Sequence, residues 1–525
     1  MGKDGLFCLC GRATLGYPRP VGNNCPVGVM FGFIRFFLAL VCLAMPGFAE
    51  ASRDRIALVI GVGDYQHLPP LQNTHNDASS MAKTLENIGF DVTLSMDPTS
   101  EEMGRQLESF AFRSEVAELA LIYFAGHGIE VQGENFLIPA DANVASNRDV
   151  QRQSTSLKQL LAAVEHARKM RIVILDSCRD NPLGDSIDLT TLANETQAGE
   201  ATRGGGGGLA AVDPDRGTLV AFAARDGQVA LDGNGTNSPY AEALMQKMVQ
   251  PNLEISLMFR QVRDLVLQKT GNLQEPHTYG SLTGVPFYLT GDSNSALPAG
   301  TSDAWSALKP DQEEQLLALA ELGDTRSMLG LAYMRLNPNA GQFDPQAAVA
   351  FLQRAADAGA PEAQFELAKL YERGTGVERD EQKALQLYQA AARQNFADAI
   401  NDLGFLHHQG GLGLPPNAKT AYEFFRRAAE LRHPQAQFNY AALIDDGLVP
   451  GKGPKDSAQF LYAALRSGSS DVLNLLSDRP NMFTPATRRE LQKKLKEKRF
   501  YQGSIDGDFG PGTQRGIRRA YGLED

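Results

Sequence analysis

The sequence predicts a multidomain protein: an α/β sandwich with a mostly parallel sheet, then an all-α helical-repeat solenoid, then a small α-helical module. At roughly 150 residues per domain, 525 residues suggest about three folded units. Short β-branched runs alternate with helical stretches over residues 54–290. A helical pattern then recurs every 36 or 37 residues within 310–470, and 481–525 carries a third pattern. We expect residues 291–309, which are polar and rich in small side chains, to be a linker.

The composition is that of an ordinary globular protein. Hydrophobic residues make up 43% and charged residues 21% of the chain, which excludes disordered and collagen-like classes. Fifty basic and 62 acidic side chains give a net charge of −12. This balance argues against nucleic acid as a partner.

Residues 1–51 are predicted to be an N-terminal extension with a signal peptide. The stretch from Phe31 to Met45 is apolar apart from Arg35, and Ala49-Glu50-Ala51 supplies the small residues of a cleavage site. The apolar run is short for a roughly 30 Å hydrocarbon core, which favours cleavage over a retained anchor. We expect an exported protein of the periplasm or cell envelope.

One cysteine remains after such export. The chain has five, and four of them (Cys8, Cys10, Cys25 and Cys42) lie before the cleavage site. Cys178 alone can form neither an intramolecular disulfide nor a cysteine-rich zinc site. It is therefore either an inert buried residue or a nucleophile.

Residues 54–290 alternate between strand and helix patterns. Apolar runs of this length indicate strands that helices cover on both faces of a parallel sheet. A long loop is expected at 183–216, because the glycine run 204–208 fits neither the strand period nor the helix period. Strands are predicted at 55–62, 90–95, 119–126, 171–177, 218–224 and 285–289, and helices at 77–88, 101–112 and 157–166, at Ser238-Pro239 and at 254–268.

Two of these strands end in residues that are unusual in a hydrophobic core. His127 stands between Gly126 and Gly128 after one buried strand, and Cys178 follows another, 51 residues later. Ligands bind beside the carboxyl ends of parallel strands. A thiol needs a nearby base to attack as thiolate, and His127 is the candidate. The backbone N–H of Gly128 is positioned to stabilise an oxyanion.

Residues 54–290 resemble a caspase-like cysteine peptidase, closest to the metacaspase and orthocaspase branch. The matching segments are RIALVIGVGDY, ND at Asn76-Asp77, YFAGHG, DSCRDNP and GTLVAFAARDG. The resemblance implies an endopeptidase with a Cys178–His127 dyad. Its oxyanion hole would use the backbone N–H groups of Gly128 and Cys178.

The residues around Cys178 also predict specificity. Asp176 stands two residues before Cys178 on a strand, so both point to the same side, where a carboxylate can pair with an incoming Arg or Lys. Asp77 is a second substrate-binding candidate, although an acidic residue near a helix N-terminus needs no substrate to explain it. The resemblance to metacaspases implies cleavage after Arg or Lys, and Arg203 is a candidate self-processing site.

Residues 310–470 resemble Sel-1-like repeats, which are relatives of tetratricopeptide repeats. The pattern A-x-x-x-L-x-x-L-Y-x-x-G-x-G-V followed by K-A-x-x-x-Y-x-x-A-A starts at Ala363 and returns from Ala399, with looser copies from Ser327 and Ala436. Such a period indicates stacked helical hairpins. The resemblance implies a solenoid that binds a protein partner or acts as a spacer.

Residues 481–525 resemble a peptidoglycan-binding module. The resemblance rests on FY-x-G-x-x-DG-x-x-G-x-x-T, beginning at Phe500, between two helical stretches. It implies peptidoglycan as a partner. A folding cap for the solenoid is the other interpretation, and a solvated helical face explains the basic residues equally well.

A non-catalytic envelope scaffold on the same fold is the alternative function, which the presence of both Cys178 and His127 opposes. The expected partners are a peptide or protein substrate, a protein bound by the repeats and peptidoglycan. We expect no cofactor and no metal ligand set, and a calcium requirement stays open.

Overall fold

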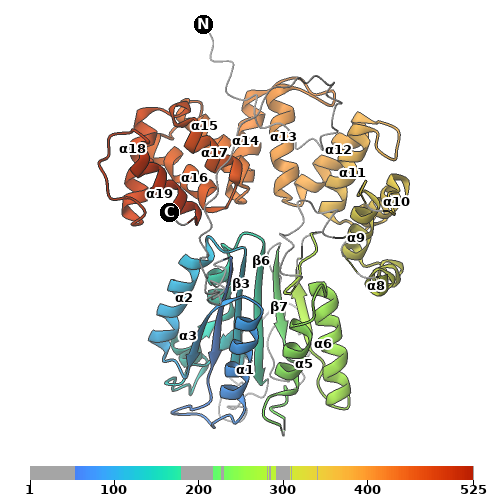
Figure 1. Cartoon of the computed structure of the whole chain (residues 1–525), viewed down its shortest axis with the longest axis vertical. Coiled ribbons are helices and arrows are strands. Elements are labelled where there is room, and N and C mark those ends of the chain that lie inside the picture. Colours follow the sequence, from blue (N-terminus) through green and yellow to red (C-terminus); the bar gives the residue numbers. More distant parts are fainter. Residues whose placement is uncertain are drawn as a thin grey trace, which may run out of the picture. The chain divides into compact units, whose positions relative to one another are not determined.

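The computed structural model describes residues 54–178, 217–225, 230–233, 235–280, 282, 285–290, 305, 308, 310–339 and 341–523. The predicted signal segment, the 183–216 loop, Arg203 and most of the 291–309 linker lie outside these residues. The layout within the described residues confirms the predicted multidomain fold class (Figure 1).

A mostly parallel sheet forms the first part of the described chain. Its strands follow the order β2-β1-β3-β6-β7-β8, and only β8 on this path runs antiparallel to its neighbour. Two short strands, β4 and β5, extend β3 in a separate antiparallel ladder. The strands are β1 (Arg55–Gly61), β2 (Asp91–Met96), β3 (Leu119–Val131), β4 (Glu134–Leu137), β5 (Thr155–Ser156), β6 (Met170–Cys178), β7 (Thr218–Phe222) and β8 (His277–Gly280).

Helices cover both faces of this sheet, as its apolar strands require. Tyr123 and Ile174 face a core shared with α1, α5 and α6, whereas Ile122 and Val173 face a core shared with α2 and α4. Alternate residues of one strand therefore serve opposite layers. The helices are α1 (Thr74–Asn87), α2 (Ser100–Ser114), α3 (Asn147–Gln153), α4 (Leu157–Val164), α5 (Pro239–Met248) and α6 (Ile255–Lys269).

The last strand differs from the prediction. Residues 285–289 form no strand, and only a bridge between Tyr288 and Glu254 remains. Phe287 and Leu289 are buried against the α5 and α6 core, so packing explains their apolar character. Pro286 also lacks the N–H that a ladder uses. The strand that pairs with β7 is the polar segment His277–Gly280.

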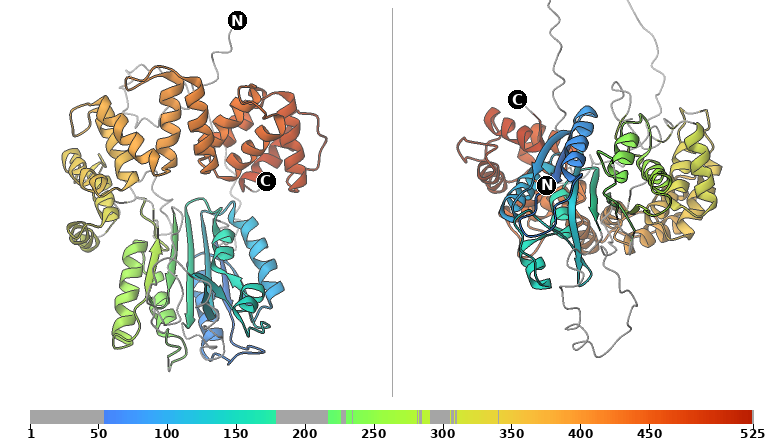
Figure 2. Two further views of the ribbon diagram at one scale, coloured as in Figure 1. Left: turned by 180° about the vertical axis from the view of Figure 1, so that it is seen from behind. Right: turned by 90° about the horizontal axis from the view of Figure 1, so that it is seen from below.

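A series of helical hairpins follows, drawn from yellow to red in the rear view of Figure 2. Their packing uses small residues where helices meet: a Cβ on Gly330 would lie 2.7 Å from the Trp305 ring, and one on Gly404 would lie 2.8 Å from Phe425. The helices are α8 (Pro310–Glu321), α9 (Thr325–Arg335), α10 (Pro345–Asp357), α11 (Pro361–Arg373), α12 (Glu381–Arg393), α13 (Ala397–Gln409), α14 (Ala418–Glu430), α15 (Pro434–Asp445), α16 (Pro454–Arg466) and α17 (Ser470–Asp478).

The C-terminal module shares its core with the last hairpins. A 3₁₀ turn (Pro480–Met482) leads into α18 (Pro485–Glu497) and α19 (Pro511–Tyr521). Leu491 and Ile517 of this module belong to one buried cluster with Phe438 of α15 and Leu461 of α16. The module therefore buries the apolar side of the final hairpins, as a cap does in a repeat protein.

None of the helices in the described part of the chain combines the length and apolar character that a membrane crossing needs.

Candidate active site

His127 and Cys178 are direct neighbours on adjacent parallel strands. In the register of β3 and β6, His127 pairs with Cys178, and Ala125 pairs with Asp176. Paired residues of neighbouring strands lie about 5 Å apart. The fold thus brings together the two residues of the predicted dyad, 51 positions apart in the chain, although the Cys178 side chain lies outside the described atoms.

The imidazole of His127 is held in one orientation. Its Nε2 atom lies 3.0 Å from the carbonyl oxygen of Pro69, and a carbonyl can only accept. Nε2 therefore carries the proton, and the neutral ring has its lone pair on Nδ1. That atom is buried and has no hydrogen-bond partner among the described residues, as a general base requires before its substrate proton arrives.

Burial sets the protonation of this ring. His127 is 6% exposed, and burial lowers its pKa, opposed by the hydrogen bond to Pro69. The neutral form therefore dominates at neutral pH. In this form Nδ1 can take a proton from a thiol.

Tyr65 supports the histidine from the other side. The Tyr65 hydroxyl accepts the backbone N–H of His127 at 2.7 Å, and the two ring centroids lie 4.6 Å apart. This hydroxyl fills the space beside Gly126, where an added Cβ would lie 2.7 Å from it. A glycine at 126 therefore lets Tyr65 reach the strand end.

The ladder between β3 and β4 directs the Gly128 N–H away from β4. The backbone N–H of Ile138 donates to the carbonyl of His127 at 3.0 Å, and Gly128 is opposite Leu137 in the register. Antiparallel pairs alternate between bonded and non-bonded types, so the Gly128–Leu137 pair is non-bonded. The N–H of Gly128 thus points away from β4 and is not used in this ladder.

A pocket with three carboxylates lies beside the strand ends. Asp77 of α1 and Asp176 of β6, both predicted as substrate-binding, line it together with Asp232. Gly126 and Ser238 also belong to its wall. Asp232 gives no signal in the sequence, because it lies in a segment without strand or helix periodicity.

Specific donors hold the two buried carboxylates. Asp77 Oδ1 accepts from the Asn237 side chain at 2.8 Å and from the Ser238 N–H at 2.9 Å. Asp176 Oδ2 accepts from the hydroxyl of Tyr123 at 2.9 Å and from that of Ser238 at 2.7 Å. All of these donors are neutral, so none of these contacts neutralises the negative charge of the carboxylates.

Burial and mutual repulsion raise the pKa values of these acids. The pKa of Asp77 rises to about 7, through burial first and the charge of Asp176 second. Burial raises the pKa of Asp176 to about 6, although hydrogen bonds from Ser238 and Tyr123 lower it. Burial also raises the pKa of Asp232. A cation placed beside these carboxylates would lower their pKa values, because an opposite charge favours the ionised form.

One group of metal-ligating type occurs among the described residues, formed by Asp64, His75 and Asp97. Hydrogen bonds explain the arrangement: Asp97 Oδ1 accepts from the N–H groups of Gly63 at 2.9 Å and Asp64 at 3.0 Å, and from His75 at 2.9 Å. The cluster therefore supports a turn after β1.

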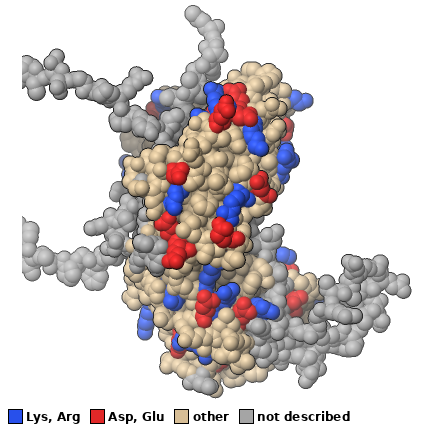
Figure 3. All heavy atoms as spheres, turned by 90° about the vertical axis from the view of Figure 1, so that its right-hand side faces the viewer, with Lys and Arg blue, Asp and Glu red and all other residues tan. Residues whose placement is uncertain are grey.

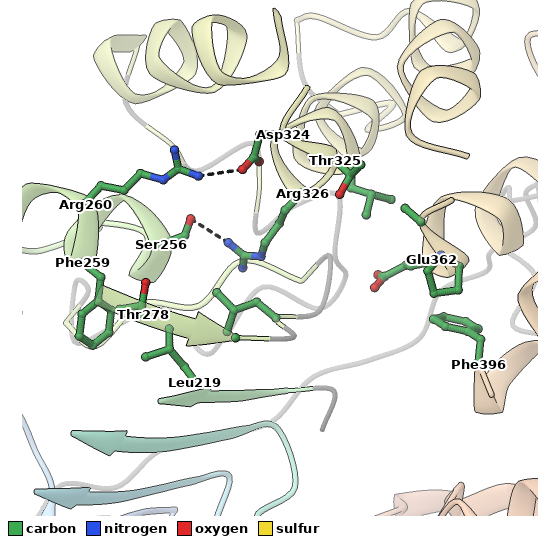
Figure 4. Close-up of a pocket in the computed structure, with 15 residues that line it drawn as sticks. Leu219, Ser256, Phe259, Arg260, Thr278, Asp324, Thr325, Arg326, Glu362 and Phe396 are labelled. Atoms are coloured by element: carbon green, nitrogen blue, oxygen red, sulfur yellow. Dashed lines mark hydrogen bonds and ion pairs between the residues drawn. The ribbon is translucent and has the colours of Figure 1, made fainter. Parts of the chain in front are cut away.

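A second cavity, of about 440 Å³, lies between α6, β8 and the N-terminal ends of α9 and α11 (Figure 4). Ion pairs cross it from the sheet domain to the first repeat. Arg260 bonds Asp324 at 2.7 Å, and Arg326 bonds the buried Glu254 at 2.7 Å and Ser256 at 2.9 Å. This cavity does not include the predicted dyad.

Two parts of the chain match known protein families. Residues 54–287 match the family described as Caspase domain. Residues 54–287 form a caspase-like domain. Residues 325–359, 361–396 and 397–433 match the Sel1 repeat family, so the caspase-like domain is followed by Sel1 repeats.

The relatives match only parts of their own chains. Human mucosa-associated lymphoid tissue lymphoma translocation protein 1 is 27% identical over 140 residues, which cover 26% of this chain and 17% of that protein. Cat caspase-1 is 25% identical over 145 residues, covering 26% of this chain and 33% of the relative. A solved Sel1 repeat protein from Oxalobacter formigenes aligns at a TM-score of 0.29 with 22% identity, covering 35% of this chain and 56% of that one.

Proposed function

We propose that the caspase-like domain is a cysteine endopeptidase that cleaves peptide bonds after Arg or Lys. The observation that carries the proposal is the register of His127 with Cys178, together with the unpartnered Nδ1 of His127. The family match and the caspase relatives support the same chemistry.

In the proposed cycle, Nδ1 of His127 takes the thiol proton and the Cys178 sulfur attacks the scissile carbonyl carbon. The N–H groups of Gly128 and Cys178 stabilise the resulting oxyanion. His127 then gives its proton to the leaving amine as the C–N bond breaks. Water hydrolyses the thioester, which releases the acid and restores the thiol.

The proposed specificity rests on Asp77, Asp176 and Asp232. Their shared pocket adjoins the carboxyl ends of β3 and β6, where the side chain preceding the scissile bond would lie. The pocket measures only about 10 Å³, so it would have to open before a guanidinium or ammonium group met the three carboxylates. This would give the basic preference that the resemblance to metacaspases implies.

The decisive experiment compares the wild type with Cys178→Ala on fluorogenic peptides that differ only in Arg, Lys, Asp or norleucine before the cleaved bond. We expect turnover of the Arg and Lys peptides by the wild type alone. Equal turnover by both proteins would remove the enzyme function, and a preference for Asp would remove the specificity.

We propose in addition that the protein is exported and that residues 481–525 bind peptidoglycan. The signal-like segment and the basic side chains of the module support this. N-terminal sequencing of the mature protein would show cleavage after Ala51, and a pull-down on isolated peptidoglycan would compare the full chain with a full-length variant in which the exposed Arg489, Lys493 and Lys498 are replaced by Gln. Equal recovery of both proteins with the peptidoglycan would favour the interpretation that the module only caps the solenoid.

A further inference from the structure

Six polar residues of the repeats form one surface, which we call the repeat face: Glu362, Glu366, Asp398, Asn401, Asp402 and Asn439. Glu366, Asp402 and Asn439 occupy the same position in three successive repeats, and Glu362 and Asp398 are also equivalent. Residues three or four apart lie on one side of a helix. The face therefore crosses α11, α13 and α15.

The acidic residues of the repeat face act on one another across two helices. Burial raises the pKa of Glu366 first; Lys369 lowers it, and the charges of Glu362 and Asp398 raise it again. Lys369, which bonds Glu366 at 2.8 Å, opposes only part of this negative charge. Acidic and basic side chains are interspersed on the surface that Figure 3 shows.

Among the described residues, two buried amides on the repeat face each have one polar atom without a hydrogen-bond partner. Asn401 and Asn439 are both 5% exposed. The Nδ2 of Asn401 faces Asp402 Oδ1 at 3.4 Å, and its Oδ1 has no partner. The Oδ1 of Asn439 accepts from Gln435 at 3.1 Å, and its Nδ2 has no partner. Buried polar atoms are normally paired, and these two therefore point to a ligand.

The repeat face continues into the 440 Å³ cavity, since Glu362 belongs to both. Figure 4 shows Glu362 on one side of this cavity and Thr278 of β8 on the other. Leu329 and Phe396 add apolar wall. A ligand lying along the face thus has space at its end for a side chain.

We propose that the repeat face binds an extended peptide segment rich in Lys and Arg, with Asn401 Oδ1 accepting a backbone N–H and Asn439 Nδ2 donating to a backbone carbonyl. A peptide backbone offers both groups in alternation. The four carboxylates select basic side chains and repel phosphates, so a nucleic acid does not fit. This surface is separate from the active site and does not depend on the proposed peptidase function.

Fluorescence anisotropy with a labelled twelve-residue peptide of alternating Ala and Lys tests the proposal on the full chain carrying Cys178→Ala, which prevents cleavage. We expect binding that weakens with salt, and no binding of the Ala/Glu counterpart. Asn401→Leu should weaken binding about three- to tenfold, as expected for one lost hydrogen bond. Asp398→Asn with Asp402→Asn should weaken it further and flatten the salt dependence.

The matched control is Glu381→Gln, an exposed acid on α12 that should leave the affinity unchanged. Asp77→Asn with Asp176→Asn should remove only the binding that the carboxylate pocket of the caspase-like domain contributes; complete loss of binding there would place the peptide in the caspase-like domain and overturn the proposal. Unchanged affinity in Asn401→Leu, or equal binding of the acidic peptide, would also overturn it.

A second measurement covers the case in which Asn401→Leu fails to fold. Asn439→Leu removes the other contact, and a peptide with alternate amides replaced by esters lacks the N–H groups for Asn401. We expect the ester peptide to bind the wild-type repeat face more weakly than the amide peptide. Equal binding of the two peptides would contradict the role of Asn401.

Discussion

The Nε2 atom of His127 lies 3.0 Å from the carbonyl oxygen of Pro69. This single contact fixes the tautomer, because only a protonated nitrogen can donate to a carbonyl. The remaining nitrogen, Nδ1, is then the only basic atom of the ring. The chain thus positions its proposed base with a backbone group rather than with a third side chain.

Removal of the Tyr65 hydroxyl should affect both stability and catalysis. Tyr65→Phe leaves the buried N–H of His127 without its 2.7 Å acceptor, at a cost of about 1–3 kcal/mol. We expect a lower melting temperature and a roughly tenfold lower kcat on Arg peptides. Thermal unfolding and steady-state kinetics check this. Tyr371→Phe, a partly exposed repeat tyrosine, is the control, and unchanged kcat in Tyr65→Phe would contradict the positioning role.

The carboxylate pocket should control the choice of substrate. Asp176→Asn keeps the shape but removes one charge, so kcat/KM for Arg peptides should fall at least tenfold, while that for norleucine peptides changes little. Asp77→Asn and Asp232→Asn should act in the same direction. A parallel fall on both peptides would instead indicate damage to the dyad.

The preference for Arg should depend on pH. The pKa of Asp77 is raised to about 7 and that of Asp176 to about 6, so both acids become neutral as the pH falls through this range. The ratio of kcat/KM for an Arg peptide to that for its uncharged citrulline analogue should therefore rise from pH 5 to pH 8. Because both peptides depend on the same dyad, the ratio cancels any effect of pH on Cys178 and His127. A flat ratio would contradict ionised carboxylates in recognition.

The same shift predicts a stability effect. A carboxyl whose folded pKa exceeds its unfolded value destabilises the fold increasingly as pH rises from the unfolded pKa, near 4, to the folded pKa, near 7. Asp77→Asn should therefore raise the melting temperature more at pH 8 than at pH 5. Calorimetry at both values checks the difference. A larger gain at pH 5 would refute the raised pKa.

The only tryptophan of the chain reports on the first repeat. Trp305 is fully buried against Gly330. Gly330→Ala would put a Cβ 2.7 Å from the indole and should destabilise this hairpin by about 1–3 kcal/mol. We expect an earlier transition in tryptophan fluorescence. Gly341→Ala, where an added Cβ meets nothing within 4 Å, is the control.

Sequence patterns could predict the buried strands, the repeat period and the residues at the strand ends. The runs at 119–126 and 171–177 are apolar because helices cover both faces, and this also identifies His127 and Cys178 as exceptions. The apolar pattern of residues 285–289 predicts a strand, but these residues are apolar because they pack against α5 and α6. The strand that forms instead, β8 at His277–Gly280, is polar. Periodicity cannot separate these cases.

The support of the site could not be predicted in the same way. Pro69 contributes a carbonyl, which any residue possesses, so its type gives no signal. Asp232 approaches Asp77 only through the path of the chain before α5. Tyr65 lies in a matching motif, but its contact with the His127 N–H depends on the space beside Gly126, which only coordinates give.

The side-chain hydroxyl of Ser238 has two hydrogen-bond partners with different consequences. Its hydroxyl donates to Asp176 and accepts the N–H of Ala241 at 3.0 Å, which caps α5. An amidine that binds Asp176 would compete with the Ser238 hydroxyl for this carboxylate. Because the same hydroxyl caps α5, such binding would also disturb the first turn of α5. Inhibitor design at this pocket therefore has a built-in reporter, since amide exchange at the start of α5 would record occupancy without any turnover.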